Sequence, residues 1–212
     1  YMDAPKVLKK EPAYLDDKEA QEVIRLLLVE PDIRIKTAII LLIYTGVRRG
    51  ELCGLEWKDI NFTDNTVTIC RAAQYVRNVG LVTKEPKNET SKRTFTLPPE
   101  VTTMLTQYRG WQLEERLKCG DRWLDRLDFK IVDGNGYKTV NRKNERIFTA
   151  KFGNLISPDT INFWLDKFRD SNNLPEFTPH SLRHTNVTLM IAAGVPIRTI
   201  AGRVGHAQAS TT

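Results

Sequence analysis

The side chains best suited to polar chemistry gather at the end of the 212-residue chain. The 36 residues from Phe177 to Thr212 contain no Asp or Glu, but they hold all three histidines and three arginines: His180, His184, His206, Arg183, Arg198 and Arg203. A solvated helix face normally mixes both signs of charge. A segment with one sign only calls for a negatively charged partner outside the chain, and a phosphate is the candidate.

A helix start is expected to bring two of these side chains together. Thr178 and Pro179 are favourable N-cap and N1 residues, so His180 falls in the first helical turn. Arg183 follows three residues later on the same face. The first turn of a helix presents unpaired backbone N–H groups and a partial positive charge. An anion bound there would meet a helix end, an imidazole and a guanidinium together.

A second helix is expected to position the last histidine. It ends at Gly205, delivers His206 and has a predicted buried stripe of Ile197, Ile200, Ala201 and Val204. Taken alone, each polar residue of this segment also has an ordinary explanation, as a cap, a surface ion pair or an accident of position. The whole set, with no acid nearby in the sequence, favours an anion site.

Two further motifs lie upstream. The stretch YTGVRRGELCGLEWKDI covers residues 44–60, and PKNETSKRTFTLP covers residues 86–98. Near the C-terminus they are followed by HSLRHT and AGVPIRTIAGRVGH. This order of motifs resembles that of the tyrosine recombinases, the phage and conjugative-transposon integrases, and the resemblance extends over residues 14–212. It implies site-specific DNA recombination, the integration or excision of a mobile element.

The resemblance assigns roles to individual residues. The implied catalytic residues are Arg48, Lys87, His180, Arg183 and His206. Glu51, one helical turn after Arg48, matches the acidic residue that supports the site. Lys92 is the alternative to Lys87, because Asn88 and Glu89 replace the residues usual in this segment of the family. The implied DNA-binding residues are Arg49, Lys92, Arg93, His184 and Arg198.

These residue types fit the implied chemistry. A phosphodiester repels nucleophiles, and its transition state gathers negative charge on the non-bridging oxygens. Arg48 and Arg183 can hold those oxygens with forked hydrogen bonds. His180 and His206 can donate hydrogen bonds or take a proton near neutral pH, and Lys87 would protonate the departing 5′ oxygen. In the family a tyrosine attacks and forms a 3′-phosphotyrosyl link, so the resemblance implies neither a metal nor another cofactor.

The attacking tyrosine is expected just after Thr212. The six tyrosines of the sequence are Tyr1, Tyr14, Tyr44, Tyr75, Tyr108 and Tyr137, none of them near the C-terminal motif. The sequence as given is therefore expected to lack the nucleophile and to be inactive in cleavage. The resemblance further implies that the partner is double-stranded DNA, on which the protein assembles, as a tetramer.

The patterning along the chain predicts an α+β fold, mostly helical with one small antiparallel sheet. Helices are expected after the capping box of Asp16 and Glu19, over 32–44, within 45–57 and over 99–127. Another is expected from Ser157, with Pro158 in its first turn, and two more after Thr178, with residues 193–196 between them. Strands are expected over 66–70, 72–83 and 94–98, and a short hairpin over 146–156. Residues 1–13 are expected to be a linker from an upstream core-binding domain, and residues 14–212 the catalytic domain.

The composition agrees with this interpretation and excludes others. The 32 Lys and Arg exceed the 26 Asp and Glu, and the net charge of +6 permits nucleic-acid binding. Cys53, Cys70 and Cys119 form no C-x-x-C pair, so neither a disulfide framework nor a structural zinc site is expected, and a reducing cytoplasm fits best. The longest apolar run, AIILLIY at 38–44, is too short to cross a bilayer.

Three other functions remain open from the sequence. The stretch MIAAGVPIRTIAGRVGH at 190–206 resembles a helix-turn-helix, which would make the protein a binding module without catalysis, but this leaves TGVRRGEL unexplained. A type IB topoisomerase would use a related residue set, although the motif spacing favours integrases. A metal hydrolase would use His180 and His184, which are four residues apart but lack the adjacent Glu of H-E-x-x-H.

Overall fold

The computed structural model describes residues 15–85, 92–133 and 136–204. The linker expected over 1–13 lies outside these residues. The helices are α1 (Asp17–Leu28), α2 (Ile33–Thr45), α3 (Arg49–Gly54), α4 (Pro99–Cys119), α5 (Pro158–Ser171), α6 (Pro179–Ala192) and α7 (Ile197–Val204). Short 3₁₀ turns cover Trp57–Asp59, Gly120–Arg122 and Lys151–Gly153. No helix among the described residues is long and apolar enough to cross a membrane.

The predicted helix starts are confirmed. The Asp16 side chain accepts a hydrogen bond from the backbone N–H of Glu19 at 2.8 Å, and the Glu19 carboxylate accepts one from the N–H of Asp16 at 2.9 Å. Ser157 caps α5 in front of Pro158. The helix predicted over 99–127 is too long, because α4 ends at Cys119, where Gly120 takes a positive φ of 54°.

The mostly helical α+β class is confirmed, and the strands form two sheets where a single small antiparallel one was expected. The first sheet is antiparallel, in the order β1 (Ile60–Asn61), β2 (Thr66–Ile69), β5 (Arg93–Thr96). The second has the order β3 (Ala72–Val76), β4 (Gly80–Lys84), β6 (Arg126–Asp133), β7 (Gly136–Lys143), and its β4–β6 pair is parallel. The hairpin expected over 146–156 is reduced to a single bridge between Thr149 and Leu155.

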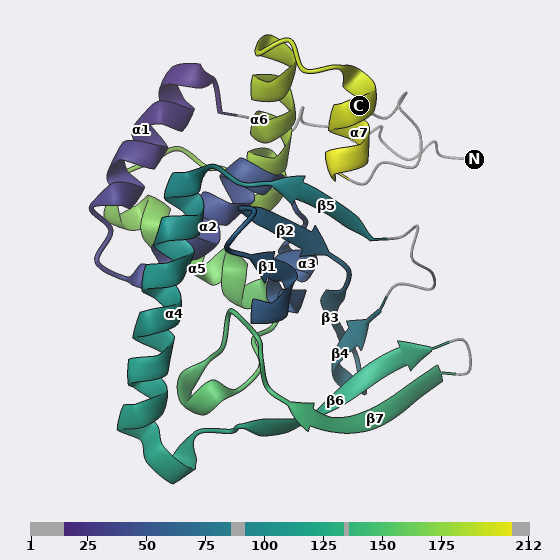
Figure 1. The fold of residues 1–212 in the computed structure, drawn as a ribbon. Coiled ribbons are helices and arrows are strands. Elements are labelled where there is room, and N and C mark those ends of the chain that lie inside the picture. The colour runs from purple at the N-terminus through teal and green to yellow at the C-terminus, as the bar shows by residue number, and fades with distance from the viewer. Residues whose placement is uncertain (1–14, 86–91, 134–135, 205–212) are drawn as a thin grey trace, which may run out of the picture.

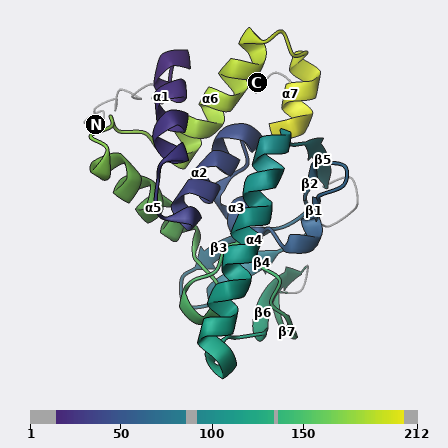
Figure 2. The same ribbon diagram turned by 60° about the vertical axis from the view of Figure 1, so that its left-hand side comes forward.

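Helix α2 runs through the middle of the helical layer. It packs against α1, α4, α5 and α6, and these helices surround it in both views (Figures 1 and 2). Its buried apolar residues are Ile35, Ala38, Ile39, Ile40, Leu41, Leu42 and Ile43. A helix that is apolar on all sides belongs in the core. Its C-terminal end therefore has a fixed position from which the following loop and α3 can be built.

Helix α3 lies directly against the backbone of strand β3. A Cβ added to Gly50 would come within 2.5 Å of the Ala73 carbonyl oxygen, and one added to Gly54 within 2.7 Å of the Arg71 carbonyl oxygen. Only glycine permits this separation. The two glycines, one helical turn apart, therefore determine how closely α3 approaches the four-stranded sheet.

A buried group of ion pairs ties the second sheet to the end of α3. The Glu56 carboxylate, 3% exposed, lies 3.0 Å from Arg142 Nη2 and 3.5 Å from Arg71 Nη1. Arg71 also pairs with Asp59, and Arg146 donates to the carbonyl of Gly54. Burial lowers the pKa of Arg146 to about 10. Buried charges of this kind need partners, so the network fixes both α3 and the sheet.

Candidate functional site

The first part of the site is the turn from α2 into α3. Gly46 ends α2 in the left-handed conformation, with φ 61°, and its N–H donates to the Leu42 carbonyl at 2.9 Å. Arg48 is the N-cap residue of α3. The Glu51 carboxylate accepts from the backbone N–H of Arg48 at 2.8 Å and from Arg48 Nη1 at 3.3 Å. The Arg48 side chain remains half-exposed, so the turn presents it at the surface.

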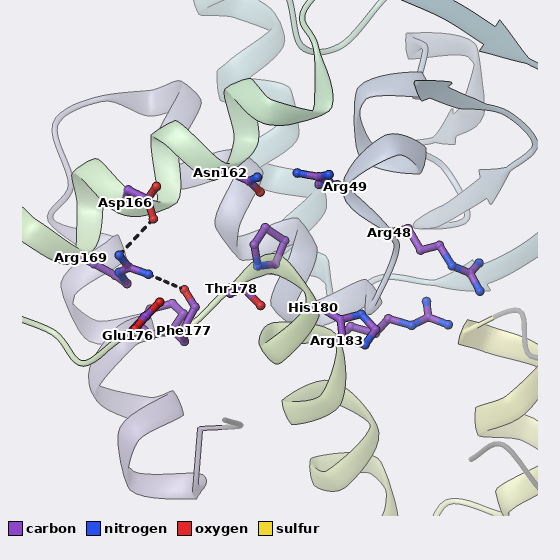
Figure 3. Close-up of a pocket in the computed structure, with 11 residues that line it drawn as sticks. Arg48, Arg49, Asn162, Asp166, Arg169, Glu176, Phe177, Thr178, His180 and Arg183 are labelled. Carbon is purple, nitrogen blue, oxygen red and sulfur yellow. Dashed lines mark hydrogen bonds and ion pairs between the residues drawn. The ribbon is translucent and has the colours of Figure 1, made fainter. Parts of the chain in front are cut away.

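The second part is the start of α6. As predicted, Thr178 is the N-cap and Pro179 follows it; Thr178 Oγ1 accepts from the N–H of Ser181 at 3.1 Å. Arg169 of α5 donates from Nη1 to the Phe177 carbonyl at 2.8 Å, which holds the approach to the helix (Figure 3). His180 is exposed in the first turn. The N-cap residue and the proline after it thus predicted the position of His180 in the helix correctly.

Arg183 is more deeply placed than its sequence suggests. We expected it to face a bound phosphate and not the core, or to make a surface ion pair, but it is only 4% exposed. Its Nη1 donates to the Gly46 carbonyl at 2.6 Å, across 137 positions of sequence. Burial lowers its pKa to about 10, and the positive charge of Arg48 acts in the same direction. The carbonyls at the end of α2 lack partners within the helix, and Arg183 supplies a donor to one of them.

His180 and His184 form a hydrogen-bonded pair. Their Nε2 atoms are 3.0 Å apart and their rings meet edge to face, with centroids 4.6 Å apart. Burial lowers the pKa of His180, and the charges of His184, Arg183 and Arg48 lower it further. The neutral imidazole is therefore favoured at His180. His184, which we predicted to bind DNA, is half-buried and contacts His180; DNA binding by His184 remains a prediction.

One cleft of about 630 Å³ joins the two parts of the site. Its walls include Arg48, Arg49, His180 and Arg183. Figure 3 shows the side chains of Arg48 and Arg183 extending in the same direction, with His180 beside Arg183. The other residues that line it are Asn162, Asp166, Arg169, Glu176, Phe177, Thr178 and Pro179. Four of the predicted site residues are thereby gathered around one space.

A second cleft of about 570 Å³ lies on the β3 side of Arg48. It shares Arg48 and Arg49 with the first cleft and is also bounded by Gln74 and Tyr75 of β3. Arg49 donates from Nη1 to the carboxylate of Asp159 at 2.9 Å, an exposed pair. The start of α3 therefore contributes to two clefts, and each of them is lined by the guanidinium groups of Arg48 and Arg49.

The remaining predicted residues differ from one another in exposure and in the contacts that they make. Arg93 Nη1 and Nη2 donate to the two Glu51 oxygens at 3.0 and 2.7 Å, so this guanidinium faces a carboxylate. Lys92 and Arg198 are exposed. Ile197 is 55% exposed and does not belong to the buried stripe predicted for α7, whereas Ile200 and Ala201 are buried as expected. Lys87 and His206 lie outside the described residues.

Two residues that hold the site were missed in the sequence. Asn186 Nδ2 donates to the Ile43 carbonyl at 2.7 Å, and Arg203 Nη2 donates to the Tyr44 carbonyl at 2.8 Å. The position of Asn186, three residues after Arg183 on one helix face, was a usable signal. No comparable signal marked Arg203. Among the described residues, no group of three or more His, Cys, Asp or Glu could hold a metal ion.

The fold and this cleft define an α+β domain with the chemistry of an anion-binding site, and comparisons identify its family. Residues 13–212 match the phage integrase family, and the chain belongs to it. It is 30% identical over 187 residues to a "Tyrosine recombinase XerC-like" protein of Caldanaerobacter subterraneus, covering 84% of this chain and 44% of that protein. It is 25% identical over 215 residues to the integrase of Staphylococcus phage L54a, covering 100% of this chain and 53% of that protein. The relatives are enzymes, tyrosine recombinases and integrases.

Solved structures agree on the fold. The Tn1549 transposon integrase, in a structure described as a complex with a circular intermediate DNA, matches with a TM-score of 0.76 at 20% identity, over 98% of this chain and 62% of that one. The XerA recombinase matches with a TM-score of 0.67 at 22% identity, over 98% of this chain and 59% of that one. The chain spans about half the length of the curated relatives it matches. The matches give no support to a helix-turn-helix regulator or a type IB topoisomerase.

Proposed function

We propose that this chain is the catalytic part of a site-specific recombinase, which cleaves and rejoins DNA through a 3′-phosphotyrosyl intermediate. One observation carries the proposal: Arg48, His180 and Arg183, from two distant parts of the sequence, line a single cleft. A phosphodiester is the anion that this combination fits, because two guanidinium groups and an imidazole can contact its non-bridging oxygens together. Family membership supports the same reaction.

Each residue has a role in the proposed reaction. Arg48 and Arg183 neutralise the charge that builds up on the phosphate oxygens. His180, kept neutral by its surroundings, donates a hydrogen bond or accepts the proton of the attacking hydroxyl. Lys87 and His206 complete the set from segments outside the described residues. Glu51 holds the Arg48 backbone and guanidinium in place.

The proposed partner is duplex DNA, on which the protein is proposed to assemble as a tetramer. Relatives of similar fold have been solved in complex with DNA, and the net charge of +6 favours a polyanion. Binding through phosphates should release counterions, so we expect the affinity for a duplex to fall at least tenfold between about 50 and 200 mM salt. Fluorescence anisotropy with a labelled duplex measures this. An affinity that does not change over this range would contradict binding through phosphates.

The attacking group is the second part of the proposal. Of the tyrosines in the described residues, Tyr108 is fully buried, Tyr44 at the end of α2 is partly buried, Tyr75 is exposed on β3 and Tyr137 is exposed on β7. We expect the 212-residue chain to bind DNA without forming a covalent adduct. A version extended past Thr212 should trap a nicked suicide duplex as a band that survives denaturant, with or without chelator.

Two substitutions make this test specific. Phenylalanine at the first tyrosine after residue 212 should remove the band and leave binding within about threefold, because only the nucleophilic oxygen is lost. Tyr75→Phe is the matched control, since Tyr75 and Arg48 both line the second cleft. An adduct formed by the 212-residue chain and removed by Tyr75→Phe would show that the nucleophile was misplaced. An extended protein that binds but never forms the adduct would refute the recombinase proposal.

A further inference from the structure

Helix α7 is not part of the main hydrophobic core. Its buried Ile200 packs with Val187 of α6, and the partly buried Met190 and Val195 complete this small cluster, which is separate from the core around α2. An isolated helix of eight residues is unstable in water. Contact with α6 alone would leave α7 free to shift with respect to α3 and Arg48, so another interaction must determine its position.

Arg93, the first residue of β5, supplies one such interaction. Its Nε donates to the carbonyl of Arg203 in the last turn of α7 at 2.8 Å. Its two terminal nitrogens bind both oxygens of Glu51 in α3, at 3.0 and 2.7 Å. The last carbonyls of a helix lack partners within the helix and attract positive charge. All three nitrogens of one guanidinium, with a side chain only 16% exposed, thus join α7 to α3.

Arg203, at the end of α7, makes contacts with α2 and β5. Its Nη2 donates to the Tyr44 carbonyl at the end of α2, at 2.8 Å. Its guanidinium carbon lies 4.8 Å from the centre of the Phe95 ring of β5, a cation–π contact. Helix α7 and strand β5 are also in contact along the backbone. The end of α7 is therefore bound to three elements, α2, α3 and β5, by groups on two arginines.

We propose that Glu51, Arg93 and Arg203 form a clasp that sets the position of the end of α7 relative to Arg48. The functional consequence rests on the proposed function: the chain continues from α7 to His206 two residues later, and Lys87 precedes β5 by six residues. In the sequence, the clasp thus lies close to both Lys87 and His206, and it contacts no DNA itself. Arg93, which the sequence suggested as a DNA contact, is then a positioning residue.

Hydrogen exchange of the free 212-residue chain tests the clasp without DNA. In Arg93→Lys the charge is kept, but a single ammonium cannot reach Glu51 and the Arg203 carbonyl together. We expect the amides of α7 to exchange about tenfold faster, since hydrogen bonds to a charged group are lost, and those of α1 to be unchanged. Arg25→Lys, an exposed pair on α1, is the control. Unchanged exchange in α7, or equal acceleration throughout the chain, would overturn the proposal.

The NMR chemical shifts of the histidine rings provide a second measurement, one that a general loss of stability would not change at a single histidine. The chain has three histidines, which substitution to Gln assigns one by one. Arg93→Lys and Arg203→Lys should each shift the ring signals of His206 and leave those of His180 in place, and Arg203→Lys serves alone if Arg93→Lys folds poorly. Ring signals of His206 that do not shift in either variant would refute the clasp.

Duplex binding separates the clasp from a direct DNA contact. Arg93→Lys should bind a duplex within about threefold of the parent chain, because the net charge is retained. A loss of affinity as large as that of Arg48→Gln, with α7 exchange unchanged, would make Arg93 a DNA contact and overturn the clasp. A chain whose α7 responds as expected but which binds no DNA would keep the clasp and refute the proposed function.

Discussion

Gly50→Ala tests whether the contact between α3 and β3 positions Arg48. The added methyl would lie 2.5 Å from the Ala73 carbonyl oxygen, 0.9 Å closer than the 3.4 Å at which ordinary contact begins. The oxygen belongs to the backbone and the methyl is attached directly to Cα, so neither can rotate away. Helix α3 must then move away from the sheet by most of that distance, and Arg48, its N-cap residue, must move with it.

Gly110→Ala is the matched control. Gly110 lies in α4, and a Cβ added there meets nothing within 4 Å. It should raise Tm by about 1–4 °C, because alanine stabilises a helix by roughly 0.5–1 kcal/mol relative to glycine and a domain of this size gains about 2–4 °C per kcal/mol. Gly50→Ala gains the same propensity but has a cost of about 1–3 kcal/mol for overpacking, so its Tm should fall roughly 2–12 °C below that of Gly110→Ala.

Calorimetry and duplex anisotropy at constant salt give the two measurements. We expect Gly50→Ala to bind the duplex several-fold more weakly than Gly110→Ala, and in an extended, cleaving protein to lose on the order of a hundredfold in rate, as a misplacement near 1 Å causes. If the two variants have equal Tm and equal affinity, the glycine contact does not determine where Arg48 lies.

Two further predictions concern the residues of the cleft. His180 should titrate below the ordinary histidine pKa of about 6.5, because burial and His184 disfavour its charged form. Since the pKa is lower in the folded state than in the unfolded state, the contribution of His180 to the free energy of unfolding is complete above about pH 6.5. That contribution is lost as the pH falls toward the lowered pKa. NMR titration of the three histidines measures this, and a His180 pKa above 6.5 would contradict it. Arg183→Ala should lower Tm by about 3–12 °C, because the Gly46 carbonyl loses a charged donor that contributes roughly 1.5–3 kcal/mol. An unchanged Tm would contradict this, since it would mean that the cost of burying the cation equals the free energy of the hydrogen bond.

Local chemistry explains what could be predicted from the sequence. The helix starts at Asp16, Ser157 and Thr178 depend on hydrogen bonds between residues two or three positions apart, so the sequence pattern contains all the information. The apolar run of α2 likewise predicts its own burial. For the same reason, the first turn of α6, with His180, was placed correctly.

The features that were missed depend on distant partners. Strand β7 is largely exposed, so the apolar alternation that identifies a strand is weak in it, and its pairing with β6 was not predicted. The pairing of β4 with β6 brings together segments separated by the whole of α4. The burial of Arg183 depends on Gly46, 137 positions away, and no local pattern in α6 contains that information.

The three side chains that bind the end of α2 explain why the site forms where it does. Asn186, Arg183 and Arg203 donate to the carbonyls of Ile43, Gly46 and Tyr44. These carbonyls lie at the C-terminus of the most buried helix, where water is scarce and the helix dipole is negative, so cationic donors are favoured. Arg183 satisfies this requirement and also lines the cleft, which means that the same guanidinium serves the fold and the site. A substitution at Arg183 should therefore change stability and phosphate binding together, whereas one at the exposed Arg48 should change binding alone.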